Sequence, residues 1–201
     1  MKSFFVSTAF AAAVLFGLGN GPVTAAVQPP VSIASAAAYC VEQGGGVQTR
    51  LPEFNTNGGT PLVLSGRAYF CQFTSKKDGS QINILLRTLY SRKPSLAALA
   101  YYAKVPLGGS CTGNPASCYC TLLGGSDLFG GVNLSGGGWV LKSDPNDVLE
   151  ACIFPDLSSI DSWGLAYHSA GIVRGKNLAK VLRTRNPYTS PTSTTGRPFK
   201  R

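Results

Sequence analysis

Six cysteines are the residues with the clearest chemistry in this sequence of 201 residues, and they are Cys40, Cys71, Cys111, Cys118, Cys120 and Cys152. Such a set serves either as a disulfide framework in an oxidising compartment or as a metal site. The spacing matches no zinc pattern, and the single histidine, His168, is remote in sequence from the close group at 111–120. We therefore expect disulfides, and neither a metal nor a cofactor.

Candidate catalytic groups are few. A hydrolase needs a nucleophile, a base and an orienting acid, and His168 is the only histidine available as a base, without a Gly-x-Ser-x-Gly elbow to accompany it. Two pairs of carboxylates, Glu150 with Asp161 and Asp144 with Asp147, are candidates for acid and base in glycoside hydrolysis. Because acids this sparse are usually surface groups, we assign no catalytic residue.

Aromatic side chains offer a second kind of chemistry, which is stacking on a ligand such as a sugar ring. We select Trp139, Trp163 and His168 as a candidate ligand surface, although aromatic residues in small domains are mostly core residues. Asn133 begins the glycosylation signal Asn133-Leu134-Ser135, which indicates an exposed loop.

The beginning of the chain has the layout of a secretory signal peptide. Lys2 precedes an apolar run from Phe4 to Phe16, which glycines and Pro22 then interrupt. The run is shorter than the ~18–20 apolar residues that span a bilayer. Small residues allow cleavage after Ala25 or Ala26, so we expect residues 1–26 to be removed and the protein to be secreted.

The net charge of +9 is spread unevenly. Residues 27–113 carry eight basic and three acidic side chains, residues 114–182 carry four and six, and residues 183–201 carry five and none. A basic face attracts an acidic polysaccharide or another acidic cell-surface component, and also an anionic membrane surface. We expect no nucleic-acid partner, because no motif interleaves aromatic with basic residues on one platform.

The sequence also repeats itself. Tyr39-Cys40 is followed after three residues by Gly44-Gly45, and Tyr119-Cys120 is followed after three by Gly124-Gly125. Cys71-Gln72-Phe73 then corresponds to Cys152-Ile153-Phe154, with cysteine separations of 31 and 32 residues. We interpret this pattern as two units, 35–106 and 107–183, after a linker at 27–34 and before a disordered, basic, Pro/Ser/Thr-rich tail at 184–201.

Units that share a fold should share a bridge. This reasoning selects Cys40–Cys71 and Cys120–Cys152, and leaves Cys111–Cys118 to close a small loop. Each longer bridge contributes about 3–4 kcal/mol in the chain-entropy model, which matters for units this small.

Local signals place a helix at the start of each unit. Asn114-Pro115 begins a helix that Gly124 ends, and Ser35 and Gly44 have the same roles upstream. Alternating residues predict strands at 47–51, 69–73, 139–141 and 147–154, and composition predicts helices at 95–102, 159–167 and 175–182. The expected fold class is α+β, with two related small units, each a short helix disulfide-linked to an antiparallel β-hairpin or small sheet and followed by a short helix.

The motif of Asn114-Pro115, Tyr119-Cys120, Gly124-Gly125, Cys152-Ile153-Phe154 and Trp163 resembles a small secreted bacterial domain of unknown function that carries a hemolysin label. The chain resembles tandem copies of it, the first copy lacking Asn-Pro and the tryptophan, and is similar overall to uncharacterised secreted proteins of filamentous fungi. The resemblance implies a compartment and a fold, and assigns no functional residue.

Together these features predict a secreted, disulfide-stabilised, non-enzymatic protein that acts as a binding or effector-like protein at an extracellular surface. Two alternatives stay open. One is a membrane-active, hemolysin-like protein, and the other is a hydrolase that uses His168.

Overall fold

The computed structural model describes residues 32–108, 111, 113–127 and 134–189, all within the compact unit Val31–Arg201. The expected leader at 1–26, the glycosylation acceptor Asn133 and the tail beyond residue 189 lie outside the described residues. The first half of the described chain contains seven elements, which are α1 (Ile33–Glu42), β1 (Gly46–Phe54), β2 (Leu62–Val63), β3 (Ala68–Thr74), β4 (Gln81–Leu85), α2 (Leu86–Tyr90) and α3 (Leu96–Ala103).

The second half contains α4 (Pro115–Leu122), β5 (Gly137–Leu141), β6 (Asp144–Leu149), β7 (Ala151–Ile153), β8 (Ser159–Asp161), α5 (Ser162–Ser169) and the short 3₁₀ helix η1 (Leu178–Lys180). Asn114 caps α4 as expected, because its side chain accepts from the backbone N–H groups of Ala116 and Ser117. Ser35 is not a cap, since α1 already begins at Ile33 after Ser32.

The strands form one antiparallel sheet in the order β6-β5-β1-β3-β4-β8-β7, with β2 beside β1. The long strand β1 pairs with β3 along its first part and with β5 and β2 along its last part. Only Glu150 separates β6 from β7, although these strands stand at opposite ends of the order. The sheet therefore curls, so that its two end strands, β6 and β7, come close enough to be joined by one residue.

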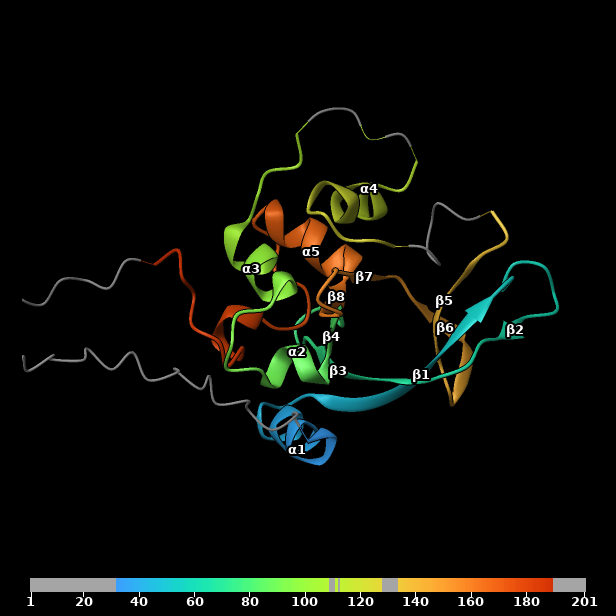
Figure 1. Ribbon diagram of the computed structural model, residues 1–201, viewed down its shortest axis with the longest axis horizontal. Coiled ribbons are helices and arrows are strands. Elements are labelled where there is room, and N and C mark those ends of the chain that lie inside the picture. Colours follow the sequence, from blue (N-terminus) through green and yellow to red (C-terminus); the bar gives the residue numbers. More distant parts are fainter. Residues whose placement is uncertain (1–31, 109–110, 112, 128–133, 190–201) are drawn as a thin grey trace, which may run out of the picture. The chain divides into compact units, whose positions relative to one another are not determined.

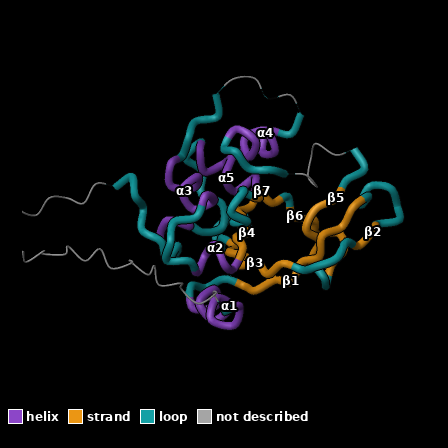
Figure 2. The backbone as a smooth tube through the Cα atoms, in the orientation of Figure 1, coloured by secondary structure: helices purple, strands orange, loops and turns teal. Residues whose placement is uncertain are grey.

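Helices cover only part of this sheet. In Figures 1 and 2 they gather around β3, β4, β7 and β8, whereas β2, β5, β6 and the far end of β1 lie apart from them. The main core, on the helix side, contains the buried cysteines of both halves together with residues such as Phe73, Ile84, Leu165 and Ile160. A second, smaller cluster of Phe70, Leu149 and Ala151 with Trp139 lies on the other face.

Three disulfides join Cys40 to Cys71, Cys111 to Cys118 and Cys120 to Cys152, the pairs expected from the sequence. The first attaches α1 to β3 and the last attaches α4 to β7, whereas Cys111–Cys118 closes a small loop onto α4.

The disulfides explain why each half has a Gly-Gly pair after its first helix. Gly44 and Gly124 have φ values of 81° and 79°, in the left-handed region that ends a helix. A Cβ on Gly45 would lie 2.4 Å from Cys71 Sγ, and a Cβ on Gly125 would lie 2.4 Å from Cys152 Sγ. The second glycine of each pair therefore lets the backbone pass directly over a disulfide.

Two expectations about the sheet are wrong. We assigned Trp139 to Leu141 to the second unit, but β5 pairs with β1 of the first half, so the halves share one sheet instead of each having its own. Ser159 to Asp161, expected at the start of a helix, form β8, and α5 follows it.

The C-terminal expectations also change. The expected helix at 175–182 reduces to the 3₁₀ turn η1. Thr184, which we placed in the tail, is 3% exposed, and its carbonyl accepts from the Tyr102 hydroxyl at 2.7 Å. Arg183 lies over the rings of Tyr90 and Tyr39, at 4.0 and 5.5 Å, and fixes this segment to the first half.

Candidate functional site

His168 lies in the last turn of α5, and its side chain is buried. It is 2% exposed, and its ring stacks on that of Tyr101 with centroids 3.7 Å apart and planes 7° apart. Burial, together with the smaller effect of the Lys104 ammonium, lowers the pKa of His168 to about 4, and the backbone of Tyr101 acts in the opposite direction. Neither ring nitrogen has a hydrogen-bond partner by geometry among the described residues, so no nucleophile is in position for His168 to activate.

The proposed pair of Asp144 and Asp147 has structural roles. Asp147 forms an ion pair with Arg50 at 3.0 Å, and Arg50 is fully buried. The same guanidinium donates to Gln48 Oε1 and to the carbonyl of Trp139, so it joins β1 to the β5–β6 hairpin. Asp144 accepts from the backbone N–H of Asn146, two residues further along β6.

The other proposed pair, Glu150 and Asp161, is divided between two helix starts. Glu150 accepts two bonds from the Asn114 amide, at 3.1 and 3.0 Å, next to the N-terminus of α4. Asp161 caps α5 by accepting from Gly164 N at 2.9 Å, and burial raises its pKa. Among the residues the structure describes, no group of three or more His, Cys, Asp or Glu is placed to hold a metal ion.

The outer side of α5 carries a cluster of aromatic and basic side chains. Trp163 and Tyr167 stand four residues apart, which places them on one side of the helix, and their ring centroids are 5.9 Å apart. With Ile172 and Arg174 they line a shallow depression, and the Arg174 guanidinium lies 5.2 Å from the Tyr167 ring centroid. We call these four residues the α5 surface cluster.

Local packing fixes the cluster. Gly164 lies against β4, where an added Cβ would come within 2.6 Å of Ile82 Cγ1, so α5 approaches the sheet closely and Trp163 is directed elsewhere. Gly175, after Arg174, has φ 58° and donates to Ser80 Oγ at 3.1 Å. The segment carrying Arg174 is therefore held against the turn between β3 and β4.

That turn makes the surroundings more basic. It carries Lys76 and Lys77, both exposed, while its only acid, Asp78, is bonded to Ser80 within the turn. Lys176 follows Arg174 and donates to the carbonyl of Gln43, which adds a further positive charge nearby. An anionic ligand at the α5 surface cluster therefore approaches a positive field.

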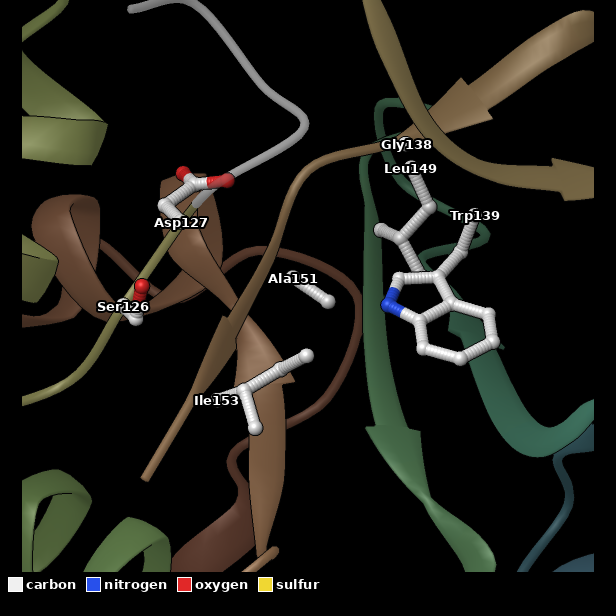
Figure 3. A pocket seen from close by; sticks show the side chains of 7 residues that line it. All are labelled: Ser126, Asp127, Gly138, Trp139, Leu149, Ala151 and Ile153. Atoms are coloured by element: carbon white, nitrogen blue, oxygen red, sulfur yellow. The ribbon is translucent and has the colours of Figure 1, made fainter. Parts of the chain in front are cut away.

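Trp139 lies in a different place, a partly open cavity of about 100 Å³. Its lining comprises Ser126, Asp127, Gly138, Trp139, Leu149, Ala151 and Ile153. Figure 3 shows Trp139 and Leu149 facing Ala151 and Ile153 across this space. The three residues selected as one ligand surface thus lie in three environments: Trp163 on the surface, His168 in the core and Trp139 in the cavity.

Comparisons with protein-family models, with curated proteins and with solved structures give no match. Function must therefore be argued from the α5 surface cluster and the cavity.

No helix within the described ranges is both long enough and apolar enough to cross a membrane. Sequence reasoning found Trp163 but missed Tyr167 and Arg174. The spacing of Trp163 and Tyr167 by one helical turn was a usable signal, whereas Arg174 comes close only because the chain turns back after α5.

Proposed function

We propose that the mature chain is a secreted, non-enzymatic binding protein that attaches to an acidic polysaccharide at an extracellular surface. The α5 surface cluster is the observation that carries this proposal. An indole face offers a platform for a sugar ring, and a guanidinium offers paired donors to a carboxylate or sulfate. The neighbouring lysines strengthen attraction to a polymer of repeated negative charge.

Secretion is supported by the leader-like residues 1–26 and by three disulfides, which persist in oxidising compartments. A binding or effector-like role is favoured over an enzymatic one, because no described residue bonds to the ring nitrogens of the buried His168 and the proposed carboxylates make structural bonds.

We further propose that the scaffold arose by duplication, as its two similar cysteine motifs imply. The two long bridges have the same strand pairing beside them. In each half, the residue six positions after the first cysteine pairs with the residue that follows the second cysteine. These pairs are Gly46 with Gln72 and Ser126 with Ile153. The last strand of each half runs directly into a helix, α2 after β4 and α5 after β8. These matches support the duplication, although only one half continues into a long strand after its Gly-Gly motif.

The binding proposal is tested by retention of the mature protein on polygalacturonate, with chitin as a neutral polysaccharide, at low and high salt. We expect retention on polygalacturonate that salt weakens, and at least tenfold weaker binding for Trp163→Ala and Arg174→Gln. Tyr188→Ala, which removes another exposed aromatic side chain, serves as the matched control and should bind normally. Equal retention of all variants would disprove the assignment of this site.

A membrane-active protein is the second candidate, favoured by exposed apolar side chains at the far end of β1. Phe54 pairs with Leu62 of β2, and these side chains are 38% and 60% exposed. Leu134, held close by a bond from Asn57 to its carbonyl, is 98% exposed. Dye release from anionic vesicles, abolished by Phe54→Ser with Leu62→Ser, would favour this function over polysaccharide binding.

A further inference from the structure

The three disulfides differ in how far solvent reaches their cysteines. The cysteines of the two long bridges are fully buried in the main core, and they are Cys40, Cys71, Cys120 and Cys152. Cys111 and Cys118 are instead partly exposed. Exchange of a disulfide requires a thiolate to reach one of its sulfur atoms. Of the three bridges, Cys111–Cys118 therefore offers the readiest access in the folded protein, and we call it the surface bridge.

The helix α4 turns Cys118 toward solvent. Thr121 and Leu122 follow Cys118 by three and four residues, which places them on the same side of the helix, and both are exposed. Cys120 is two residues from Cys118, on nearly the opposite side, and is buried together with Tyr119. The surface bridge and the buried bridge of α4 therefore leave this helix on different sides.

The position of α4 does not depend on the surface bridge. Asn114, which caps the helix, donates to the Glu150 carboxylate at 3.1 and 3.0 Å, and the Ser117 hydroxyl donates to Asp127 Oδ2 at 3.0 Å. The buried bridge from Cys120 adds a covalent bond to β7. All of these bonds can persist when the surface bridge is open.

The chain before α4 also has a bond that is independent of the surface bridge. The buried Tyr119 donates its hydroxyl to the carbonyl of Val105 at 2.6 Å. The surface bridge spans seven residues, whereas the buried bridges span 31 and 32, and a short loop restrains the unfolded chain least. Its loss should therefore cost the least stability of the three, and the protein should stay folded.

We propose that the surface bridge is a site of reversible thiol–disulfide exchange with a low-molecular-weight thiol such as glutathione. Exposed disulfides are the ones that exchange readily. The thiolate attacks one cysteine sulfur, a new S–S bond forms as the Cys111–Cys118 bond breaks, and the other cysteine leaves as a thiolate that takes a proton from water. A second thiol then displaces the first, which gives two cysteine thiols and one oxidised dimer of the small thiol. This chemistry does not depend on polysaccharide binding by the α5 surface cluster.

Reduced glutathione is the probe, added in increasing concentration to the oxidised mature protein before free thiols are trapped with iodoacetamide and located by mass spectrometry. We expect Cys111 and Cys118 to be alkylated at a glutathione concentration at least tenfold lower than the four buried cysteines require. A glutathione adduct on one of the two should appear first, and the near-UV circular dichroism should not change at this stage. Oxidised glutathione should restore the bridge. Labelling of a buried cysteine at the same concentration, or loss of the near-UV signal with the first reduction, would overturn the proposal.

Paired variants then compare the surface bridge with a buried one. Cys111→Ser with Cys118→Ser should keep the near-UV spectrum of the unmodified protein and take up no glutathione at the low concentration. Cys40→Ser with Cys71→Ser is the matched control, and it should lower the unfolding temperature more while its surface bridge still exchanges. Glutathione uptake by the first variant at the low concentration, or a larger loss of thermal stability in the first variant than in the second, would contradict the assignment.

Discussion

Ile84 lies directly opposite Ile160 where β4 pairs with β8, and each isoleucine also lies opposite a disulfide cysteine of its own half, Cys71 or Cys152. All four side chains are fully buried. This row crosses strands β3, β4, β8 and β7 and places both long disulfides in one core. The two halves of the chain therefore pack together through buried side chains of both.

Truncation of this row should destabilise the whole protein. Ile84→Ala and Ile160→Ala should each lower the free energy of unfolding by about 2–5 kcal/mol, because each leaves a cavity between the halves. Urea unfolding followed by fluorescence and by far-UV circular dichroism should give one coincident transition. Two separate transitions would show that the halves fold independently.

The glycines that cross the disulfides should tolerate no side chain. Gly45→Ala and Gly125→Ala should each cost about 1–3 kcal/mol of stability, since the new Cβ would overlap a disulfide sulfur. Gly46→Ala is the matched control, because a Cβ there meets nothing within 4 Å. Thermal unfolding of the three variants makes the comparison, and similar losses at Gly45 and Gly46 would refute the explanation.

The ion pair between the buried Arg50 and Asp147 should contribute to the stability of the protein. Asp147→Asn should lower stability by about 1.5–3 kcal/mol, the range for hydrogen bonds to charged groups. Amide exchange in β5 and β6 should rise, because Arg50 joins that hairpin to β1. Asp144→Asn, which alters only a contact within β6, should leave amide exchange at Trp139 and Val140 unchanged. If both variants behave alike, Arg50 does not hold the hairpin.

Stability should fall in mild acid because of His168. Its pKa is about 4 in the folded protein against 6.5 ordinarily, so the unfolded chain binds the proton more tightly. Above pH 6.5 the histidine does not reduce the free energy of unfolding. As the pH falls from 6.5 toward 4, protonation of His168 in the unfolded chain lowers the free energy of unfolding by roughly 2–3 kcal/mol.

Asp161 acts in the opposite direction, because its raised pKa makes the folded state bind a proton more readily than the unfolded chain does. The difference between the unmodified protein and His168→Phe isolates the histidine, since phenylalanine keeps a ring on Tyr101 without titrating. Urea unfolding at pH 7, 5.5 and 4 provides the measurement. Parallel pH profiles of the two proteins would rule out His168 as the cause.

Much of the local structure could be predicted because its causes are local or covalent. The matched cysteine spacing indicated all three bridges, and Asn114-Pro115 marked the start of α4. The Gly-Gly pairs marked the helix ends, although the reason for the second glycine is visible only with the disulfide beneath it. The candidate site was predicted in part, since Trp163 was identified without Tyr167 and Arg174.

The amino-acid sequence by itself determined the disulfide framework, the main helix positions and the α+β class, because caps, glycine conformations and cysteine spacing act over short distances. Tertiary structure alone decided that β5 pairs with β1, because the choice of strand partner depends on packing between distant segments. It also decided that His168 is buried against Tyr101, that Arg174 returns to Tyr167, and that closure of the sheet leaves a cavity beside Trp139.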